Sequence, residues 1–334
     1  MSIDIVAVDP LDPTQAELFA GWQRVLEQSE RAEYGDDHAV DTVEETRALF
    51  GHQRYERRSA WAAVEGGDMV GHLEVMLPGN DNQHRVEMTL AVRPDRRRRG
   101  IGSALFGVVE RIARDEGRSV LGCESDTASG HDDPAAPFAA RLGFTAAQRE
   151  RRSRLDLPVD VSSVRAEAEK HAEGYEVLTA WDELPDEWLA DRALLSQRMS
   201  TDVPLGALDV SEESWDADRV TYEMTLLREQ GRHVVETVAR HRASGRLVAF
   251  TDLVLPPGSD RAFQWSTLVL HEHRGHRLGL LTKAANLQAL AAERPDVRSV
   301  QTWNAYENEP MLRVNRALGF GQTGELTEWQ KTLR

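Results

Sequence analysis

The chain has 334 residues, of which 40% are hydrophobic and 29% are charged, and its formal net charge is −16. This composition is typical of a globular protein, the length allows about two domains, and the acidic charge disfavours general nucleic-acid binding because phosphate backbones select a basic surface. The sequence contains no apolar run of membrane-spanning length and no signal-peptide pattern, so we expect a cytoplasmic protein.

The first half of the sequence predicts an alternating order of strands and helices. Strands are expected at residues 3–8, 60–65, 69–76, 86–92, 119–125 and 146–157, where β-forming and apolar residues gather. Helices are expected at residues 15–30, 42–51 and 103–114. The sequence Thr42-Val-Glu-Glu fits a capping box, and Gly66-Gly-Asp fits a hairpin turn. Cys123, the single cysteine, excludes an internal disulfide and is expected to be a small buried residue.

A glycine- and arginine-rich loop joins strand 86–92 to helix 103–114 and has the pattern Arg97-x-x-Gly100-x-Gly102. Glycine tolerates positive φ and lets backbone N–H groups approach a ligand. A helix N-terminus adds free N–H donors and a positive dipole end, and arginines add charge-assisted contacts to phosphate oxygens. The loop therefore predicts a small pyrophosphate-bearing ligand, although an arginine run is also compatible with a solvated face.

The second half of the sequence repeats this order. Strands are expected at residues 175–178, 233–240, 247–255, 262–269 and 299–304. Helices are expected at residues 186–199, 216–230 and 280–292. A damaged copy of the loop follows Val269 at a constant offset, since 269 − 92 and 279 − 102 both equal 177. In this copy Arg277 replaces the glycine that corresponds to Gly100.

Each half closes with a helix that ends in Leu-Gly-Phe. The spacing from loop glycine to helix-end glycine is 143 − 102 = 41 in the first half and 319 − 279 = 40 in the second. This order of strand, (R/Q)xxGx(G/A) loop, helix, strand and LGF helix resembles the acetyl-CoA-binding core of the GNAT (Gcn5-related) N-acetyltransferases. The resemblance implies an α/β (α+β) chain of two tandem GNAT folds, each with a mixed, mostly antiparallel sheet flanked by helices.

The resemblance also implies a division of the chain and a donor substrate. We expect an N-terminal GNAT domain over residues 1–158, a linker over 159–174 and a C-terminal GNAT domain with a degenerate loop over 175–334. Acetyl-CoA is the implied donor and no metal is required. The residues implied to bind the donor are Leu90, Ala91, Val92, Arg97, Arg98, Arg99, Gly100, Ile101, Gly102 and Ser103.

Glutamate on the strand before the loop often serves as the general base in this family. Glu87 lies on that strand and is the leading candidate, with a solvated strand carboxylate as the alternative interpretation. Glu74 on the preceding strand is a weaker candidate.

The family's usual general acid is a tyrosine four residues before the helix-end glycine. The two halves carry Ala139 and Asn315 there, so neither has the tyrosine. Ser125 and His131 in the first half and Tyr306 in the second are the remaining candidates near the expected sulfur position, each with an ordinary loop role as the alternative. Otherwise the proton for the leaving thiolate comes from water or another group, or one of the two domains does no chemistry.

Several hypotheses about function stay open. The leading one is an acetyl-CoA-dependent N-acetyltransferase that modifies a primary amine of a small molecule or peptide and works as a monomer or homodimer. The tandem layout and the HRGHxLG loop also resemble mycothiol synthase, which favours a C-terminal catalytic half. A non-catalytic acyl-CoA-binding pseudoenzyme is motivated by the two missing tyrosines. Membrane and nucleic-acid partners are not expected.

Overall fold

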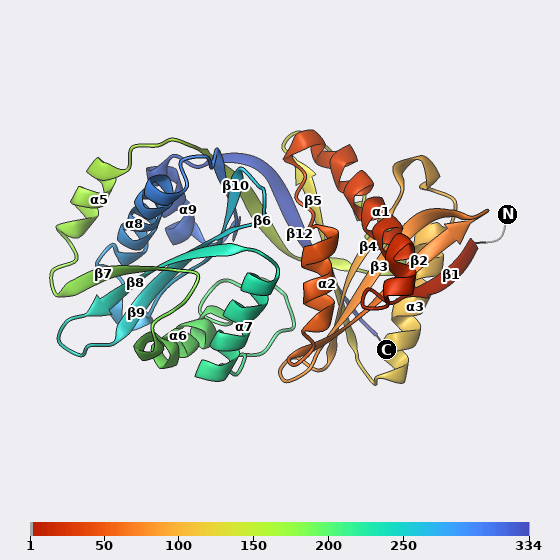
Figure 1. Ribbon diagram of the computed structural model, residues 1–334, viewed down its shortest axis with the longest axis horizontal. Coiled ribbons are helices and arrows are strands. Elements are labelled where there is room, and N and C mark those ends of the chain that lie inside the picture. Colours follow the sequence, from red (N-terminus) through yellow and green to blue (C-terminus); the bar gives the residue numbers. More distant parts are fainter. Residues whose placement is uncertain (1–2, 334) are drawn as a thin grey trace. The chain divides into compact units, whose positions relative to one another are not determined.

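A computed structural model describes residues 3–333, except for the side chain of Asp36, and it divides the chain into two compact units. Unit 1 contains residues 1–149, 206–210 and 325–334, and unit 2 contains residues 150–205 and 211–324. Residues 1, 2 and 334, which the predicted terminal domains include, lie outside the described residues. Each unit is an α/β layer structure with helices on both faces of a sheet (Figure 1).

The sheet of unit 1 has the strand order β1-β2-β3-β4-β5-β12. Its strands are β1 (Ile3–Val8), β2 (Glu56–Glu65), β3 (Asp68–Pro78), β4 (Arg85–Val92), β5 (Val120–Ala128) and β12 (Gly321–Thr332). Neighbours from β1 to β4 are antiparallel, whereas β4 and β5 are parallel. The mixed, mostly antiparallel sheet expected from the sequence is therefore confirmed for this unit.

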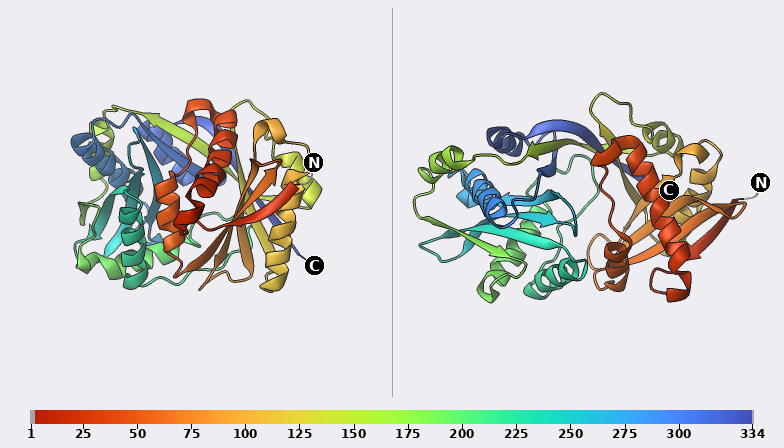
Figure 2. Two further views of the ribbon diagram at one scale, coloured as in Figure 1. Left: turned by 45° about the vertical axis from the view of Figure 1, so that its right-hand side comes forward. Right: turned by 45° about the horizontal axis from the view of Figure 1, so that its top comes forward.

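Helices cover both faces of the unit 1 sheet. They are α1 (Ala16–Tyr34), α2 (Val43–Gly51), α3 (Ile101–Asp115) and α4 (Ala136–Leu142). Trp22 of α1 stacks on the ring of His72, while Leu105 of α3 packs in a cluster with Leu73, the next residue of β3. Because successive strand residues point to opposite faces, α1 and α3 lie on opposite sides of the sheet, as Figures 1 and 2 show.

Unit 2 repeats this plan with the strand order β6-β11-β10-β9-β8-β7. Its strands are β6 (Thr145–Asp156), β7 (Tyr175–Trp181), β8 (His233–His241), β9 (Leu247–Leu255), β10 (Arg261–Val269) and β11 (Ser299–Ala305). Its helices are α5 (Ser162–Glu169), α6 (Asp186–Met199), α7 (Ala217–Glu229), α8 (Leu278–Glu293) and α9 (Glu309–Leu318). Figure 2 (right) shows the blue helix α8 and the green helices α6 and α7 on opposite faces of this sheet.

The structure divides the chain differently from the boundaries expected at residues 158 and 174. Most of β6 belongs to unit 2, where residues 150–156 pair antiparallel with β11. Most of β12 belongs to unit 1, where Trp329 joins the core beside α3. The expected linker contributes Val161 and Ala168 to the core of unit 2. Periodicity identifies strands but not their pairing partners, so this exchange of closing strands leaves no local sequence signal.

Trp329 provides a test of this assignment because its indole is buried in unit 1, where Nε1 donates a hydrogen bond of 2.7 Å to Ser125 Oγ. We expect Trp329→Ala to destabilise unit 1 by about 3–5 kcal/mol, the usual cost of truncating a buried aromatic side chain. Hydrogen exchange should then show faster exchange in α3 and β3 than in α8 and β9.

The matched control is Trp265→Ala in unit 2, because Trp265 is 48% exposed and its loss should change stability by no more than about 0.5 kcal/mol. Loss of protection in unit 2 alone on Trp329→Ala would refute the assignment of the C-terminal strand to unit 1.

Candidate functional site

The first element of the candidate site is the unpaired edge of β4. The parallel ladder between β4 and β5 covers only three residues of each strand, from the pair Arg85 with Val120 to the pair Glu87 with Gly122. Beyond it, β4 stays paired with β3 as far as Val92. The backbone groups of Leu90–Val92 that face away from β3 therefore lie past the end of the β5 ladder, where an extended ligand can hydrogen-bond to them.

The second element is the loop that leads from β4 into α3. Gly100 is the N-cap of α3 with φ of +88°, a left-handed conformation that disfavours other residues. A Cβ atom added at Gly100 would meet no atom within 4 Å, so the space beside this residue is open. The first N–H groups of α3 have no partner inside the helix, and with the helix dipole they favour a phosphate group.

Arg141 is a basic residue of this site that the sequence reasoning missed. Its guanidinium donates to Ser103 Oγ at 3.0 Å, which places a positive charge beside the first turn of α3. Arg141 belongs to α4, and nothing in the local sequence indicates that the end of α4 reaches the start of α3.

Arg97 has a structural role that differs from the predicted phosphate contact. Its Nε donates to the Val92 carbonyl at 3.2 Å, while its Nη atoms donate to Glu33 Oε1 at 2.7 Å and Ser29 Oγ at 3.0 Å. The guanidinium therefore fastens the loop to α1 and to the end of β4. In unit 2, Arg274 makes the same 3.2 Å contact to the Val269 carbonyl, so this bond is a property of the repeated fold.

The rest of the arginine run divides into paired and available side chains. Arg93 forms an ion pair with Asp95, and Arg96 lies 3.7 Å from Asp68. Arg98 and Arg99 are exposed, and neither has an ion pair within residues 3–333. These two guanidinium groups, beside the open N-terminus of α3, are the ones free to bind an anionic ligand.

Glu87 is placed at the last pair of the parallel ladder, close to the unpaired edge. Its carboxylate accepts a 2.6 Å hydrogen bond from Arg85 Nε. Gly122 makes room for it, because a Cβ at that position would overlap the Glu87 carboxylate. Burial raises the pKa of Glu87, and the positive charge of Arg85 opposes this shift. A carboxylate with a raised pKa suits a general base that works near neutral pH.

Ser125 lies on β5 of the same unit, but both sides of its hydroxyl are occupied. The hydroxyl donates to Asp133 Oδ2 at 2.6 Å and accepts from Trp329 Nε1 at 2.7 Å. These contacts favour a structural role over proton delivery to a sulfur. Tyr306, the other predicted acid, belongs to unit 2, is 39% exposed, and accepts a 2.9 Å hydrogen bond from Gln322. The structure therefore does not bring Glu87, Ser125 and Tyr306 together within one unit.

The corresponding loop of unit 2 is built differently. Arg277 is the N-cap of α8 and adopts φ of +53°, so this arginine takes the left-handed conformation that Gly100 has in unit 1. Its guanidinium reaches Glu167 of α5 at 3.4 Å. His276 also lies near the end of α5, since its ring contacts the His171 carbonyl at 3.3 Å. The residue at the start of α8 is therefore an arginine paired with a carboxylate of α5, whereas the start of α3 has a glycine with no side chain.

Within residues 3–333, no group of three or more His, Cys, Asp or Glu side chains is arranged to hold a metal ion. Among the same described residues, every helix is too short or too polar to cross a membrane.

The fold of unit 1 is that of a GNAT domain. The family model described as "Acetyltransferase (GNAT) family" matches residues 22–144. Residues 22–144 are therefore a GNAT domain, and the chain as a whole has a tandem GNAT fold. That second statement rests on a solved tandem GNAT protein from the clavulanic acid biosynthesis pathway, which is 27% identical with a TM-score of 0.80 over 99% of this chain and 98% of that one.

Other relatives agree with this class. A mycothiol acetyltransferase of Mycobacterium avium (strain 104) is 31% identical over 159 residues, which is 43% of this chain. The matched part spans 48%, about half, of that relative's length. A GCN5-related N-acetyltransferase from Sphaerobacter thermophilus is 16% identical with a TM-score of 0.67 over 99% of this chain and 96% of that one, which shows the fold alone.

Cys123 offers a chemical test of the environment beside Glu87. Burial, followed by the nearby charge of Glu87, raises the pKa of the Cys123 thiol to about 12. At pH 8 only about one thiol in ten thousand is then ionised, and the thiolate is the reactive form. We expect the native protein to react with a disulfide reagent such as DTNB far more slowly than the denatured protein. Rapid native labelling at pH 8 would contradict this environment.

Proposed function

We propose that this protein is an acetyl-CoA-dependent N-acetyltransferase whose donor site lies in unit 1. The observation that carries the proposal is the open N-terminus of α3 at Gly100, next to the exposed Arg98 and Arg99 and the unpaired edge of β4. Phosphate groups fit the N-terminus of α3 and its arginines, and an extended arm with amide groups fits the unpaired edge of β4. Together they match a donor that carries a pyrophosphate at one end and a thioester at the other.

Acetyl-CoA supplies an activated acyl group, and the residues of unit 1 supply position and proton transfer. The loop and the β4 edge hold the donor so that the thioester lies near Glu87, which converts a bimolecular reaction into an oriented one. Glu87 accepts a proton from the ammonium form of the acceptor. The freed amine nitrogen then bonds to the carbonyl carbon as the carbon–sulfur bond breaks. The nitrogen loses its second proton as the amide forms, and water carries that proton to the leaving thiolate, because the hydroxyl of Ser125 is already bonded to Asp133.

A catalytic unit 2 and a pseudoenzyme are the alternatives. The first is disfavoured as a donor site by Arg277 and by the Glu167 carboxylate that it contacts. The second is motivated by Ala139 and Asn315 at the two positions where the family usually has a tyrosine. Thiol release from acetyl-CoA in the presence of an amine panel separates an enzyme from a pseudoenzyme.

The acceptor is proposed at the level of a primary amine on a small molecule or peptide. Support comes from the mycothiol acetyltransferase match, which covers only part of each chain, and from the raised pKa of Glu87, which suits removal of an ammonium proton. A monomer or homodimer is compatible with a donor site contained in one unit.

The two loops allow a reciprocal test of the donor site. Gly100→Arg gives unit 1 the residue that unit 2 carries at the equivalent position, and Arg277→Gly makes the opposite change. We expect Gly100→Arg to weaken acetyl-CoA binding at least tenfold by calorimetry, because a side chain enters the open space before α3. The variant should still fold, since Arg277 already adopts this backbone conformation at a cost of about 1–2 kcal/mol.

Arg277→Gly is the control and should leave acetyl-CoA affinity unchanged. If Arg277→Gly altered the affinity and Gly100→Arg did not, the donor site would belong to unit 2.

Glu87→Gln tests the proposed base. We expect kcat/KM to fall by about 10²–10⁴-fold, as is usual when a general base is removed. In the wild type, kcat/KM should rise with pH through the raised pKa of Glu87, because only the carboxylate accepts a proton. That acid limb should be absent from the variant.

Glu74→Gln provides the comparison, because Glu74 is also a partly buried strand carboxylate paired with an arginine, Arg58. The pH profile of kcat/KM for Glu74→Gln should still rise with pH as it does in the wild type. Equal losses and equal pH profiles in the two variants would rule out a special role for Glu87.

A further inference from the structure

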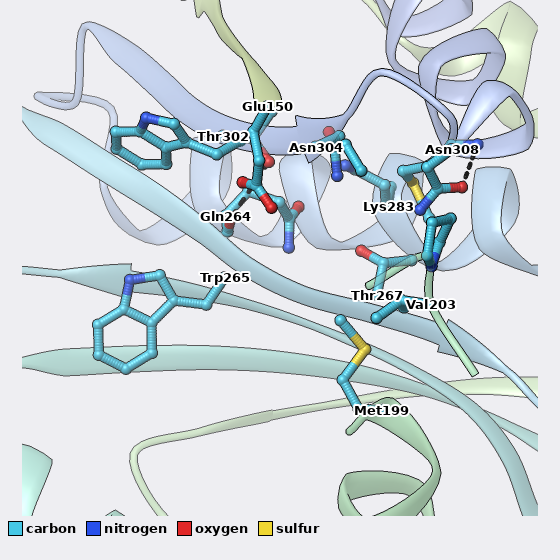
Figure 3. A pocket seen from close by; sticks show the side chains of 14 residues that line it. Glu150, Met199, Val203, Gln264, Trp265, Thr267, Lys283, Thr302, Asn304 and Asn308 are labelled. Carbon is cyan, nitrogen blue, oxygen red and sulfur yellow. Dashed lines mark hydrogen bonds between the residues drawn. The ribbon is translucent and has the colours of Figure 1, made fainter. Parts of the chain in front are cut away.

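Unit 2 contains a pocket of about 300 Å³ at the place where β10 and β11 diverge (Figure 3). The parallel ladder between these strands covers only Arg261–Phe263 and Ser299–Gln301. Every lining residue belongs to unit 2, so the pocket does not depend on the position of unit 1.

Lys283 of α8 lines this pocket although its side chain is 1% exposed. Its Nζ donates a 2.7 Å hydrogen bond to Asn315 Oδ1, and Asn315 Nδ2 donates a 2.6 Å hydrogen bond to Asn304 Oδ1. The ammonium also lies 5.3 Å from the ring centre of Phe320. An ammonium has three N–H donors, and Asn315 accepts from only one of them.

The other repeat shows that the fold does not need a cation here. The offset of 177 places Phe106 of α3 at the position of Lys283. Phe106 is buried against Phe144 with ring centres 5.8 Å apart, and Phe144 corresponds to Phe320 at the end of the LGF helix. A buried aromatic pair stabilises unit 1, whereas a buried lysine carries a desolvation cost in unit 2. Lys283 is therefore better explained by a ligand than by packing.

Nearby charges do not fully compensate Lys283. Asp252 on β9 attracts it, but Arg192 of α6 lies 3.9 Å from Asp252 and 2.9 Å from Glu236 of β8. Burial raises the pKa of both carboxyl groups. Within residues 3–333, no carboxylate lies within 4 Å of Lys283 Nζ, and burial lowers the pKa of Lys283 to about 7. Glu150 of β6 is the remaining charged residue among those that line the pocket.

The polar side of the pocket also presents amide donors. Asn304 and Asn308 use their Oδ1 atoms to accept hydrogen bonds from Asn315 and from the Met311 backbone. Within the described residues, their Nδ2 groups have no acceptor. Figure 3 shows Asn304, Asn308 and Lys283 close together, with Met199 and Trp265 on the other side of the pocket. One side of the lining thus has the Lys283 ammonium and two amide groups together with the Glu150 carboxylate, and the other side has Met199 and Trp265.

We propose that this pocket binds a small organic acid, with its carboxylate on Lys283 and the asparagine amides and its apolar part against Met199, Val203 and Trp265. A carboxylate matches a single ammonium in charge and offers two acceptor atoms to the converging donors. A phosphate dianion would leave one negative charge uncompensated. This site is separate from the donor site proposed in unit 1.

Binding in this site is linked to the protonation of Lys283. A carboxylate favours the ammonium form, so its binding raises the pKa of Lys283 above about 7. Affinity for an acid is therefore full below this pKa and falls as the pH rises above it. Between pH 6 and pH 8 the expected loss is about tenfold.

The binding experiment uses the full chain without acetyl-CoA and compares phenylacetate with its neutral analogue phenylacetamide by calorimetry at pH 6 and pH 8. We expect phenylacetate to bind at least tenfold more tightly at pH 6, and Lys283→Met to reduce this preference below threefold. Lys170→Met is the matched control, because Lys170 is an exposed lysine of the same unit, and it should keep the full preference.

An NMR titration of Lys283 in the wild-type protein tests the proposal even if Lys283→Met fails to fold. The sequence has only three lysines, Lys170, Lys283 and Lys331, so ¹³Cε-lysine labelling gives three assignable signals in the wild type. The Lys283 signal should titrate near pH 7 and move to higher pH when phenylacetate is added. Equal binding of acid and amide, no binding of either, or an unmoved Lys283 titration would each overturn the proposal.

Acetyl-CoA distinguishes this site from the donor site. If Gly100→Arg abolishes acetyl-CoA binding but leaves phenylacetate binding intact, the acid site stands whether or not unit 1 transfers acetyl groups. If acetyl-CoA displaces phenylacetate competitively, the pocket is part of an acetyl-CoA site and the proposal is wrong.

Discussion

The short parallel ladder is the constraint from which the candidate sites of both units arise. In unit 1, β4 and β5 stay paired for three residues and β4 then continues with one edge unpaired. Backbone groups at such an edge require new partners, and a ligand can supply them. In unit 2, β10 and β11 diverge in the same way, and a pocket lies between them where the ladder ends. The loop and helix that follow the first strand of each pair place a helix N-terminus next to that opening.

On this shared scaffold, a few substitutions give the two repeats different chemistry. Gly100 leaves the start of α3 open, whereas Arg277 at the equivalent position extends to Glu167. Phe106 completes an apolar core, whereas Lys283 brings a cation to the wall of a pocket. Each change is tolerated because the backbone is held elsewhere, for example by the arginine that bonds to the end of the first strand. Under the two proposals above, the divergence gives the two units separate ligands.

The sequence predicts the parts of this structure that depend on local patterns. The loop, the helix after it and the left-handed residue at Gly100 follow from glycine spacing and periodicity, and the structure confirms the fold class. Contacts between distant segments could not be predicted in this way. Arg97 is paired with Glu33, and Arg141 of another helix contacts the first turn of α3. The sequence pattern does not distinguish Lys283 from other helix residues, because only the structure shows that it is buried. Pairing partners and burial are properties of the whole fold.

The exchange of closing strands gives a physical reason for the tandem organisation. Arg85, which holds the Glu87 carboxylate, also donates to Gln330 Oε1 at 2.9 Å and to the Asp209 carbonyl at 3.0 Å. Gln330 lies on the last strand, and residue 209 belongs to a short segment between two parts of unit 2. The surroundings of the proposed base are therefore completed only after the rest of the chain has been made. An N-terminal half alone would lack these acceptors and leave a buried guanidinium partly unsatisfied, which costs free energy. The second half of the chain thus completes the surroundings of the proposed base through the covalent chain itself.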